Sequence, residues 1–297
     1  MDKVAEQYAK LVRVSTTRID GGNLFGSTVK ERWERFVTPD RQNRVAVGNY
    51  CMLINHPKGW VLVNAGPGDK APLSLDVAPM RSRSSLLREL REMGLVPKDI
   101  AFVIYTHLHD EHAGGGTHMT SSGRVLPTFP NARYIVQRAA VEEASRPSER
   151  SSHFYRSDDF LPMQETGQLD VVEGSNEVLP GVWVELAPGP TAGHQVVIAE
   201  CGRQTYAFTG VLVPTAMHLH CNVASAADRD PDATAESKQR LQRTAIAEGW
   251  QIGPVGRDEW VCARDLEALA AFSTGSTMPN RPAPAPRVRA RELVAVG

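Results

Sequence analysis

Three histidines fall within six residues of one another and suggest a metal centre. His107, His109 and His112 occur in the run Thr-His-Leu-His-Asp-Glu-His, which three glycines (residues 114–116) follow directly after Ala113. This spacing suits a loop that wraps around one ion, and neutral imidazole is a good zinc ligand. Three protein ligands with one open position are typical of a catalytic zinc site. We therefore expect catalytic zinc, with the glycines turning the backbone tightly behind the ligands and beginning a helix.

The segment before the histidine run indicates which structural element the run follows. Residues 99–105 are almost wholly apolar, as in a strand buried on both faces. The histidines thus follow the carboxyl end of a core strand, where α/β and sandwich enzymes commonly build sites. The same patterns predict strands over residues 44–54, 60–63, 132–136, 169–172, 182–186, 195–199 and 204–209, and helices over residues 84–93, 231–248 and 265–272.

The composition excludes several other classes of protein. The 297 residues include 33 basic and 34 acidic side chains, whereas nucleic-acid binders usually carry a strong basic excess. No window approaches the ~20 apolar residues of a membrane span, and the charged start is unlike a secretory signal. The four cysteines are far apart, so reduced thiols are the default. We expect a cytoplasmic protein that binds neither nucleic acid nor membrane.

A change in composition divides the chain near its end. From about residue 273 the sequence is rich in Pro, Ala, Arg and Ser. Such a segment is typically extended or disordered. We therefore expect one domain over residues 1–272, which is long enough to bury a sizeable core, and a tail over residues 273–297.

Several motifs, in order, resemble those of the metallo-β-lactamase superfamily. The histidine run is similar to that family's Thr-His-x-His-x-Asp-His-x-Gly-Gly signature. Residues 61–66 resemble its apolar strand ending in Asp-x-Gly, residues 189–194 its Gly-His turn, and residues 208–211 its Thr-Gly-Asp strand end. The resemblance spans about residues 20–265. It implies an αββα sandwich of class α/β (α+β), with two mixed β-sheets flanked by helices and the site along one edge.

The resemblance also implies a ligand set for a first zinc ion. The family holds this ion with two histidines of the run and the Gly-His histidine, which are His107, His109 and His194 here. All three are present, so one zinc ion is expected.

The second ion of the family lacks part of its ligand set in this chain. It needs the Asp and final His of the run, a bridging Asp and a late histidine. Glu111 stands in place of the run's Asp, Val211 in place of the bridging Asp, and residues 248–256 contain no histidine. Glu111 and His112 can still coordinate, but a valine cannot bridge ions. We expect the second site to be weak or empty.

Other polar residues are expected around the centre or away from it. Asn64 stands where the family has its Asp-x-Gly aspartate, which supports the site from behind the ligands. His218 and His220 follow the lost bridging position, where they could compensate as ligands or line the pocket. The remaining candidates are expected at the surface or in loops: His56, His118, His153 and Asp110.

Glu111 is the candidate catalytic residue, and two roles are open to it. Zinc on three histidines can lower the pKa of a bound water to about 7 and can polarise a carbonyl group. With the second ion absent, Glu111 is free to act as the base that removes a proton. Alternatively, it accepts a hydrogen bond from His107 or His194 and orients that ligand.

Three functions from different classes fit these features. Arginine far outnumbers lysine, and the chain length and altered metal motifs resemble the actinorhodin-type polyketide cyclases. That resemblance implies an aldol-type cyclase, with or without thioester cleavage, acting on a carrier-bound aromatic polyketide intermediate. The alternatives are a lactone or thioester hydrolase and a non-catalytic binding relative. The expected partner is a small-molecule or carrier-protein-bound acyl substrate, and a homodimer through residues 20–36 is compatible with the family.

Overall fold

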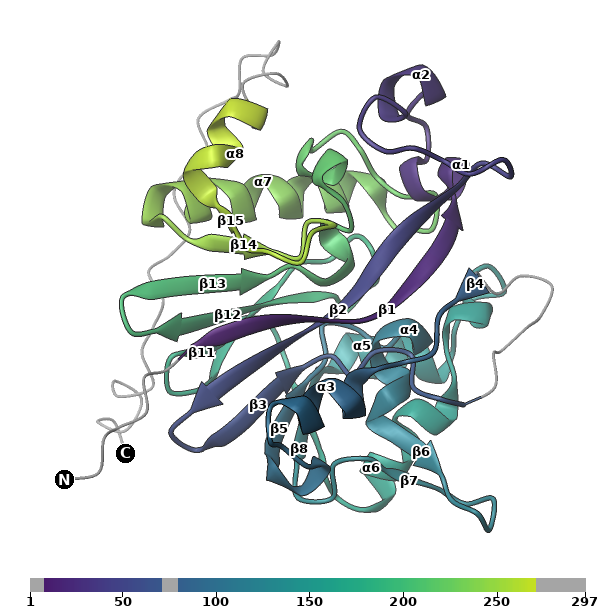
Figure 1. Cartoon of the computed structure of the whole chain (residues 1–297), viewed down its shortest axis with the longest axis vertical. Coiled ribbons are helices and arrows are strands. Elements are labelled where there is room, and N and C mark those ends of the chain that lie inside the picture. Colours follow the sequence, from purple (N-terminus) through teal and green to yellow (C-terminus); the bar gives the residue numbers. More distant parts are fainter. Residues whose placement is uncertain (1–7, 71–79, 271–297) are drawn as a thin grey trace.

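Two mixed β-sheets lie face to face, and helices cover the outer face of each (Figure 1). The structure, a computed structural model, describes residues 8–70 and 80–270. The layers follow the order α, β, β, α, which confirms the predicted fold class. The first sheet has seven strands, in the order β4 (Met80–Arg81), β1 (Ala9–Asp20), β2 (Arg44–His56), β3 (Gly59–Val63), β5 (Ile100–Ile104), β8 (Arg133–Gln137) and β9 (Leu169–Val172).

The second sheet and the helices complete the sandwich. The sheet has six strands, in the order β10 (Asn176–Leu179), β11 (Val182–Leu186), β12 (Gln195–Cys201), β13 (Gln204–Phe208), β14 (Gln251–Gly253) and β15 (Val261–Cys262). A separate hairpin pairs β6 (Thr117–Met119) with β7 (Val125–Pro127). The longer helices are α3 (Leu86–Glu92), α5 (Arg138–Ser145), α7 (Pro231–Glu248) and α8 (Ala263–Ala270), and the short ones are α1 (Gly21–Phe25), α2 (Lys30–Trp33), α4 (Asp110–Ala113) and α6 (Leu161–Glu165).

Alternation along the central strands separates the core into layers. Val61 and Val63 of β3 pack between the two sheets, whereas Leu62 faces the layer under α3 and α5. Successive side chains of a strand point to opposite faces, so a run of apolar residues fills both layers. Leu241 and Ala245 of α7 pack on the outer face of the second sheet. The central strands are therefore packed on both faces, and residues at their ends have well-defined positions in which a site can be built.

The apolar patterns predicted most of these elements. The strands over residues 169–172 and 182–186 and the helix over residues 231–248 have the predicted bounds, and the other predicted elements differ by a few residues at their ends. Strand β1 and helix α5 were not predicted. The predicted helix over residues 265–272 is α8, and the domain end at residue 272 and the tail over residues 273–297 lie outside the described residues.

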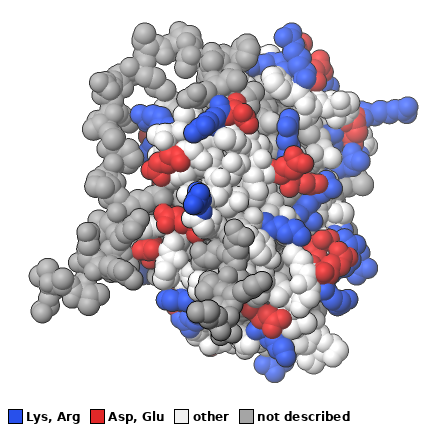
Figure 2. Space-filling view, turned by 60° about the vertical axis from the view of Figure 1, so that its left-hand side comes forward, with Lys and Arg blue, Asp and Glu red and all other residues white. Residues whose placement is uncertain are grey.

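The surface carries both signs of charge. Figure 2 shows basic and acidic side chains interspersed over one face of the molecule. No helix in the described ranges is long and apolar enough to cross a membrane. The four cysteines are free thiols, of which Cys51 and Cys201 are buried.

Candidate metal centre and substrate cavity

The ends of two parallel strands place the candidate centre. β3 and β5 are parallel neighbours in the first sheet, so the segments after them leave the sheet at one edge. The backbone N–H of Asn64, just after β3, donates to the carbonyl of Ile104 at 2.9 Å. The Asn64 side-chain oxygen accepts the backbone N–H of Thr106 at 2.9 Å. These bonds join the loop after β3 to the start of the histidine run.

The histidine run leaves β5 as a loop and enters a short helix. Helix α4 begins at Asp110, directly after His109, and the glycines form a 3₁₀ turn behind it. The glycines therefore follow this helix, and the prediction that they begin one was wrong. A Cβ on Gly115 would lie 2.1 Å from the carbonyl oxygen of Ala65. The turn needs glycine because the backbone after β3 passes directly against it.

The second sheet brings His194 to the run through Gln195, a residue that the sequence analysis did not single out. The Gln195 backbone N–H donates to the carbonyl of Thr106 at 2.9 Å. Its side chain donates to the carbonyl of Tyr105 at 2.7 Å and accepts from Gln137 at 2.8 Å. Because Gln195 opens β12, these bonds fix the adjoining His194 against a strand end of the other sheet. No local pattern distinguishes Gln195 from an ordinary strand residue.

The four histidines lie together at this edge. The ring centre of His107 is 4.6 Å from those of His109 and His112, and 5.4 Å from that of His194. His107 and His194 are fully buried, and the other two are 7% exposed. The Nε2 atom of His107 and both ring nitrogens of His194 are buried without a hydrogen-bond partner. Such atoms are costly in a protein interior unless a ligand takes them up.

Burial keeps two of these rings neutral. It lowers the pKa of His107 far below the usual value, and the neighbouring rings of His112, His109 and His194 add to the shift. Burial also lowers the pKa of His194 to about 3. A neutral imidazole offers a lone pair, which is the form that binds a metal.

Glycine is also required where the strand β13 ends. Gly210 has φ +55°, and a Cβ there would lie 2.8 Å from both His194 Nε2 and Thr106 Oγ1. The next residue, Val211, lines the cavity and carries no ligand atom. At the end of β13 the centre is therefore bordered by closely packed backbone and an apolar side chain, without a carboxylate from residue 211.

A cavity of about 360 Å³ opens over the histidines. His109, Glu111 and His112 line it, whereas His107 and His194 lie behind them. Its wall also includes a set of apolar side chains, among them Leu24, Val47, Phe154, Phe208 and Val211. The His109 ring stacks on Phe154 at 4.7 Å between ring centres. The volume lies within the usual range of about 300–1,000 Å³ for small-molecule sites.

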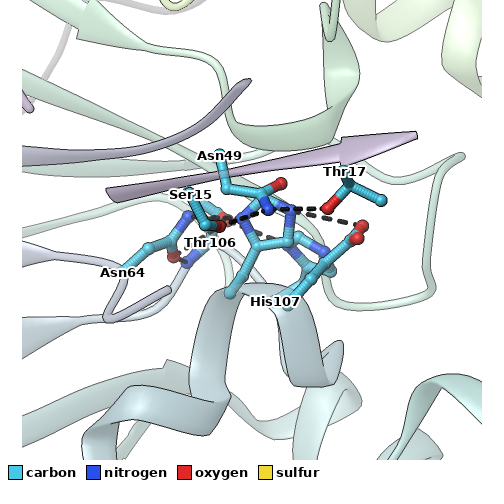
Figure 3. A network of polar contacts seen from close by, with 8 residues as sticks. Ser15, Thr17, Asn49, Asn64, Thr106 and His107 are labelled. Atoms are coloured by element: carbon cyan, nitrogen blue, oxygen red, sulfur yellow. Dashed lines mark hydrogen bonds and ion pairs between the residues drawn. The ribbon is translucent and has the colours of Figure 1, made fainter. Parts of the chain in front are cut away.

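A network of polar contacts surrounds the histidine run (Figure 3). The Asn64 side-chain nitrogen lies 3.2 Å from His112 Nδ1, and the Thr106 hydroxyl lies 2.9 Å from His107 Nδ1. His112 Nε2 lies 3.6 Å from a carboxylate oxygen of Glu111. The same view shows a second polar group from β1 and β2, in which Asn49 donates to Ser15 and Thr17 at 2.7 and 2.8 Å.

His218 and His220 lie apart from the cavity wall that the described residues form. Nδ1 of His218 contacts the Thr215 hydroxyl at 2.8 Å, and its Nε2 contacts the Leu24 carbonyl at 2.9 Å. With both nitrogens occupied, His218 is a structural residue, and its predicted place as pocket lining or ligand was wrong. His220 is 7% exposed, lies edge-on to Phe36, and has a buried Nδ1 without a partner.

Two of the four residues expected at the surface or in loops are buried instead. Asp110 is 7% exposed and lines the cavity, because it begins the helix that turns back under the run. His56 ends β2, is 5% exposed, and contacts the carbonyl of Pro180 at 2.9 Å. His118 and His153 are exposed, as expected, although the His153 side chain also lines the cavity.

The chemistry of these side chains fits a metal ion. His107 and His194 offer neutral, buried nitrogens without partners, and His109 adds a third ring on the cavity side. As placed, no three His, Cys, Asp or Glu side chains of residues 8–70 and 80–270 are grouped so that they could hold an ion. Binding therefore requires rotation of the rings, of which those of His109 and His194 have their centres 4.6 and 5.4 Å from that of His107. The unpartnered nitrogens favour those rotations.

Comparison with known proteins agrees with this architecture. The family model described as "Metallo-beta-lactamase superfamily" matches residues 44–246. An N-acyl homoserine lactonase from a Bacillus species is 30% identical over 162 residues. That alignment covers 51% of this chain and 58% of the lactonase, so the chain matches little more than half the length of this relative.

Solved structures share the fold over a longer stretch. A probable metal-dependent hydrolase from Staphylococcus aureus has a TM-score of 0.77 and 24% identity, and the match covers 85% of this chain and 90% of that one. AidC, a dizinc quorum-quenching lactonase, has a TM-score of 0.66 and 16% identity, with 85% and 88% covered. At these identities the likeness concerns the fold alone.

Proposed function

The chain belongs to the metallo-beta-lactamase superfamily, and we propose that it is a zinc-dependent hydrolase that opens an acylated lactone. One observation carries the proposal: buried, neutral and unpartnered histidine nitrogens lie directly beneath a largely apolar cavity. The N-acyl homoserine lactonase activity of the matched relative supports a lactone as the substrate class. The predicted alternative, a lactone hydrolase, is therefore favoured over the predicted cyclase.

Each part of the site has a role in this proposal. His107, His109 and His194 would hold the zinc ion. When bound, zinc lowers the pKa of a water molecule and polarises a carbonyl group. The apolar wall around Phe154 and Phe208 receives the acyl chain and excludes water from it.

Glu111 supplies the proton chemistry in this proposal. Ring opening requires that a proton leave the attacking water and reach the departing alkoxide. The Glu111 side chain lines the cavity, and its exposed fraction is 16%. A carboxylate in this place can accept the proton and return it.

One zinc ion per chain is part of the proposal. Val211 offers no ligand atom at the cavity wall. The dizinc relative shares only the fold with this chain, so its ion count does not transfer. The cyclase reading stays a prediction, since neither the family model nor the relatives described above name such an activity.

The proposal is tested by hydrolysis of N-acyl homoserine lactones of graded chain length by purified zinc-loaded protein, followed through release of acid. Turnover should be abolished by chelation and restored by zinc. His194→Ala should lose both zinc and activity, while His118→Ala, at an exposed position, should keep both. Failure to open any lactone by a protein that holds zinc would overturn the lactonase proposal. Ring closure of a poly-β-keto thioester would then favour the cyclase.

A further inference from the structure

The side-chain nitrogen of Asn64 contacts Nδ1 of His112. We infer that Asn64 holds His112 with its proton on Nε2, so that His112 is a hydrogen-bond donor at the cavity floor and not a ligand of a second ion. This inference rests on the metal-binding part of the proposed function and not on the substrate.

The orientation of the Asn64 amide is fixed by the backbone. Its Oδ1 lies 2.9 Å from the backbone nitrogen of Thr106, which can only donate. The oxygen must therefore face Thr106, and the amide cannot be turned over without placing two donors against each other. The residue itself is held at φ +60°, and its own N–H donates to Ile104. Asparagine is among the residues that tolerate this left-handed conformation.

The fixed orientation of the Asn64 amide determines which ring nitrogen of His112 carries the proton. The Asn64 Nδ2 group lies 3.2 Å from His112 Nδ1, and an amide nitrogen only donates. His112 Nδ1 must therefore accept, so the proton of the neutral ring is on Nε2. That nitrogen lies 3.6 Å from a carboxylate oxygen of Glu111, which attracts an N–H. The two neighbours of the ring thus favour the same tautomer.

His107 shows the opposite arrangement in the same site. Its Nδ1 lies 2.9 Å from the Thr106 hydroxyl, which can accept a proton because it can donate its own to Asn64 Oδ1 at 3.1 Å. Its Nε2 is buried without a partner, where an N–H would be left unsatisfied. His107 is therefore prepared as a metal ligand through Nε2, whereas His112 is not.

The consequence is a metal centre restricted to one ion. For His112 to bind an ion through Nε2, its proton would have to move to Nδ1 and face the Asn64 N–H. An aspartate at position 64 would instead accept that proton, because a carboxylate is an acceptor only. Asn64 and Val211 thus act together: one withholds a nitrogen ligand and the other supplies no bridging oxygen.

The test measures tautomers and zinc content in the full-length protein. Long-range ¹H–¹⁵N spectra, with the His112 signal assigned from a His112→Gln variant, should show an Nε2–H ring in both metal-free and zinc-loaded wild type. Zinc per chain should be about one. In Asn64→Asp the His112 ring should become Nδ1–H, and Asn64→Asp with Val211→Asp should bind about two ions.

The controls separate this inference from the proposed function. Asn55→Asp makes the same chemical change in β2, outside the cavity wall, and should leave both readouts unchanged. An Nδ1–H ring in the wild type, or an unchanged ring in Asn64→Asp, would overturn the inference. Should the variants fail to fold, the wild-type spectrum alone decides it. Lack of lactone hydrolysis would overturn the substrate proposal and leave these measurements intact.

Discussion

Two roles were predicted for Glu111: a base that removes a proton, or a hydrogen-bond acceptor that orients a histidine ligand. Its side chain lines the cavity, and one carboxylate oxygen lies 3.6 Å from His112 Nε2. This placement favours a group that exchanges protons over one that orients a ligand of the first ion. Removing the negative charge of Glu111 should therefore change the rate of catalysis and not the zinc content.

Glu111→Gln should lower kcat about 10²- to 10⁴-fold and leave zinc content unchanged, because an amide cannot accept the proton. Steady-state kinetics and metal analysis check this. Glu149→Gln, at an exposed position, provides the matched control. A fall in zinc content with little change in kcat would show instead that Glu111 is a ligand.

The buried ring of His218 makes the free energy of unfolding depend on pH. Burial lowers its pKa to about 3, while an unfolded histidine titrates near 6.5. The unfolded chain therefore takes up a proton below pH 6.5 that the folded chain refuses until about pH 3. The stabilisation is complete above pH 6.5 and declines as the pH falls, by up to about 1.4 kcal/mol per pH unit.

His218→Gln should flatten this decline, because glutamine does not titrate in the window. Urea unfolding at several pH values between 6.5 and 4 measures the difference in slope between variant and wild type. His118→Gln, at an exposed site, should keep the wild-type slope. Equal slopes for wild type and His218→Gln would contradict the assignment.

Among the elements, β12 connects the two halves of the site. Gln195 makes one backbone and two side-chain hydrogen bonds across the sandwich, to Thr106, Tyr105 and Gln137. Gln195→Leu keeps the size of the side chain but leaves the Tyr105 carbonyl without this buried donor. We expect a loss of about 1–3 kcal/mol in unfolding free energy.

The same variant should also bind zinc more weakly, because His194 adjoins the disturbed position. Denaturant titration and competition with a zinc chelator measure the two effects. Gln204→Leu, at the start of β13, where its contacts are long, is the control. Full zinc affinity in Gln195→Leu would show that His194 is positioned without it.

An element can be predicted from the sequence when the residues that determine it are neighbours in the chain. β5 and β11 were predicted because an apolar run is sufficient to bury a central strand. β1 was not, because its buried positions include Ser15 and Thr17, whose polarity is satisfied by Asn49 more than thirty residues away. The histidine run could be found because its members are neighbours in sequence. The structural role of His218 could not, because its Leu24 partner is 194 residues distant.

For the whole molecule, the proposed zinc ion would tie the two sheets together. His107 and His109 follow a strand of the first sheet, and His194 precedes a strand of the second. An ion bound only to the folded chain stabilises it by about 2.7 kcal/mol at a free concentration one hundred times its Kd.

Under that condition, zinc should raise Tm by roughly 4–5 °C over chelated protein. Scanning calorimetry with and without zinc checks this. His194→Ala should show no such rise, since it lacks the ligand that joins the second sheet to the first. A rise that persists in His194→Ala would place the bound ion elsewhere.

The bond between Gln195 and Tyr105 also has a kinetic consequence. It closes a stretch of 90 residues, and loops of this length form slowly because their closure loses much chain entropy. The pairing of β3 with β5 can precede it, so the histidine run can reach its strand end while His194 is still distant. The three histidines would then meet only when the sheets dock, and the assembled protein would capture its metal as a late event of folding.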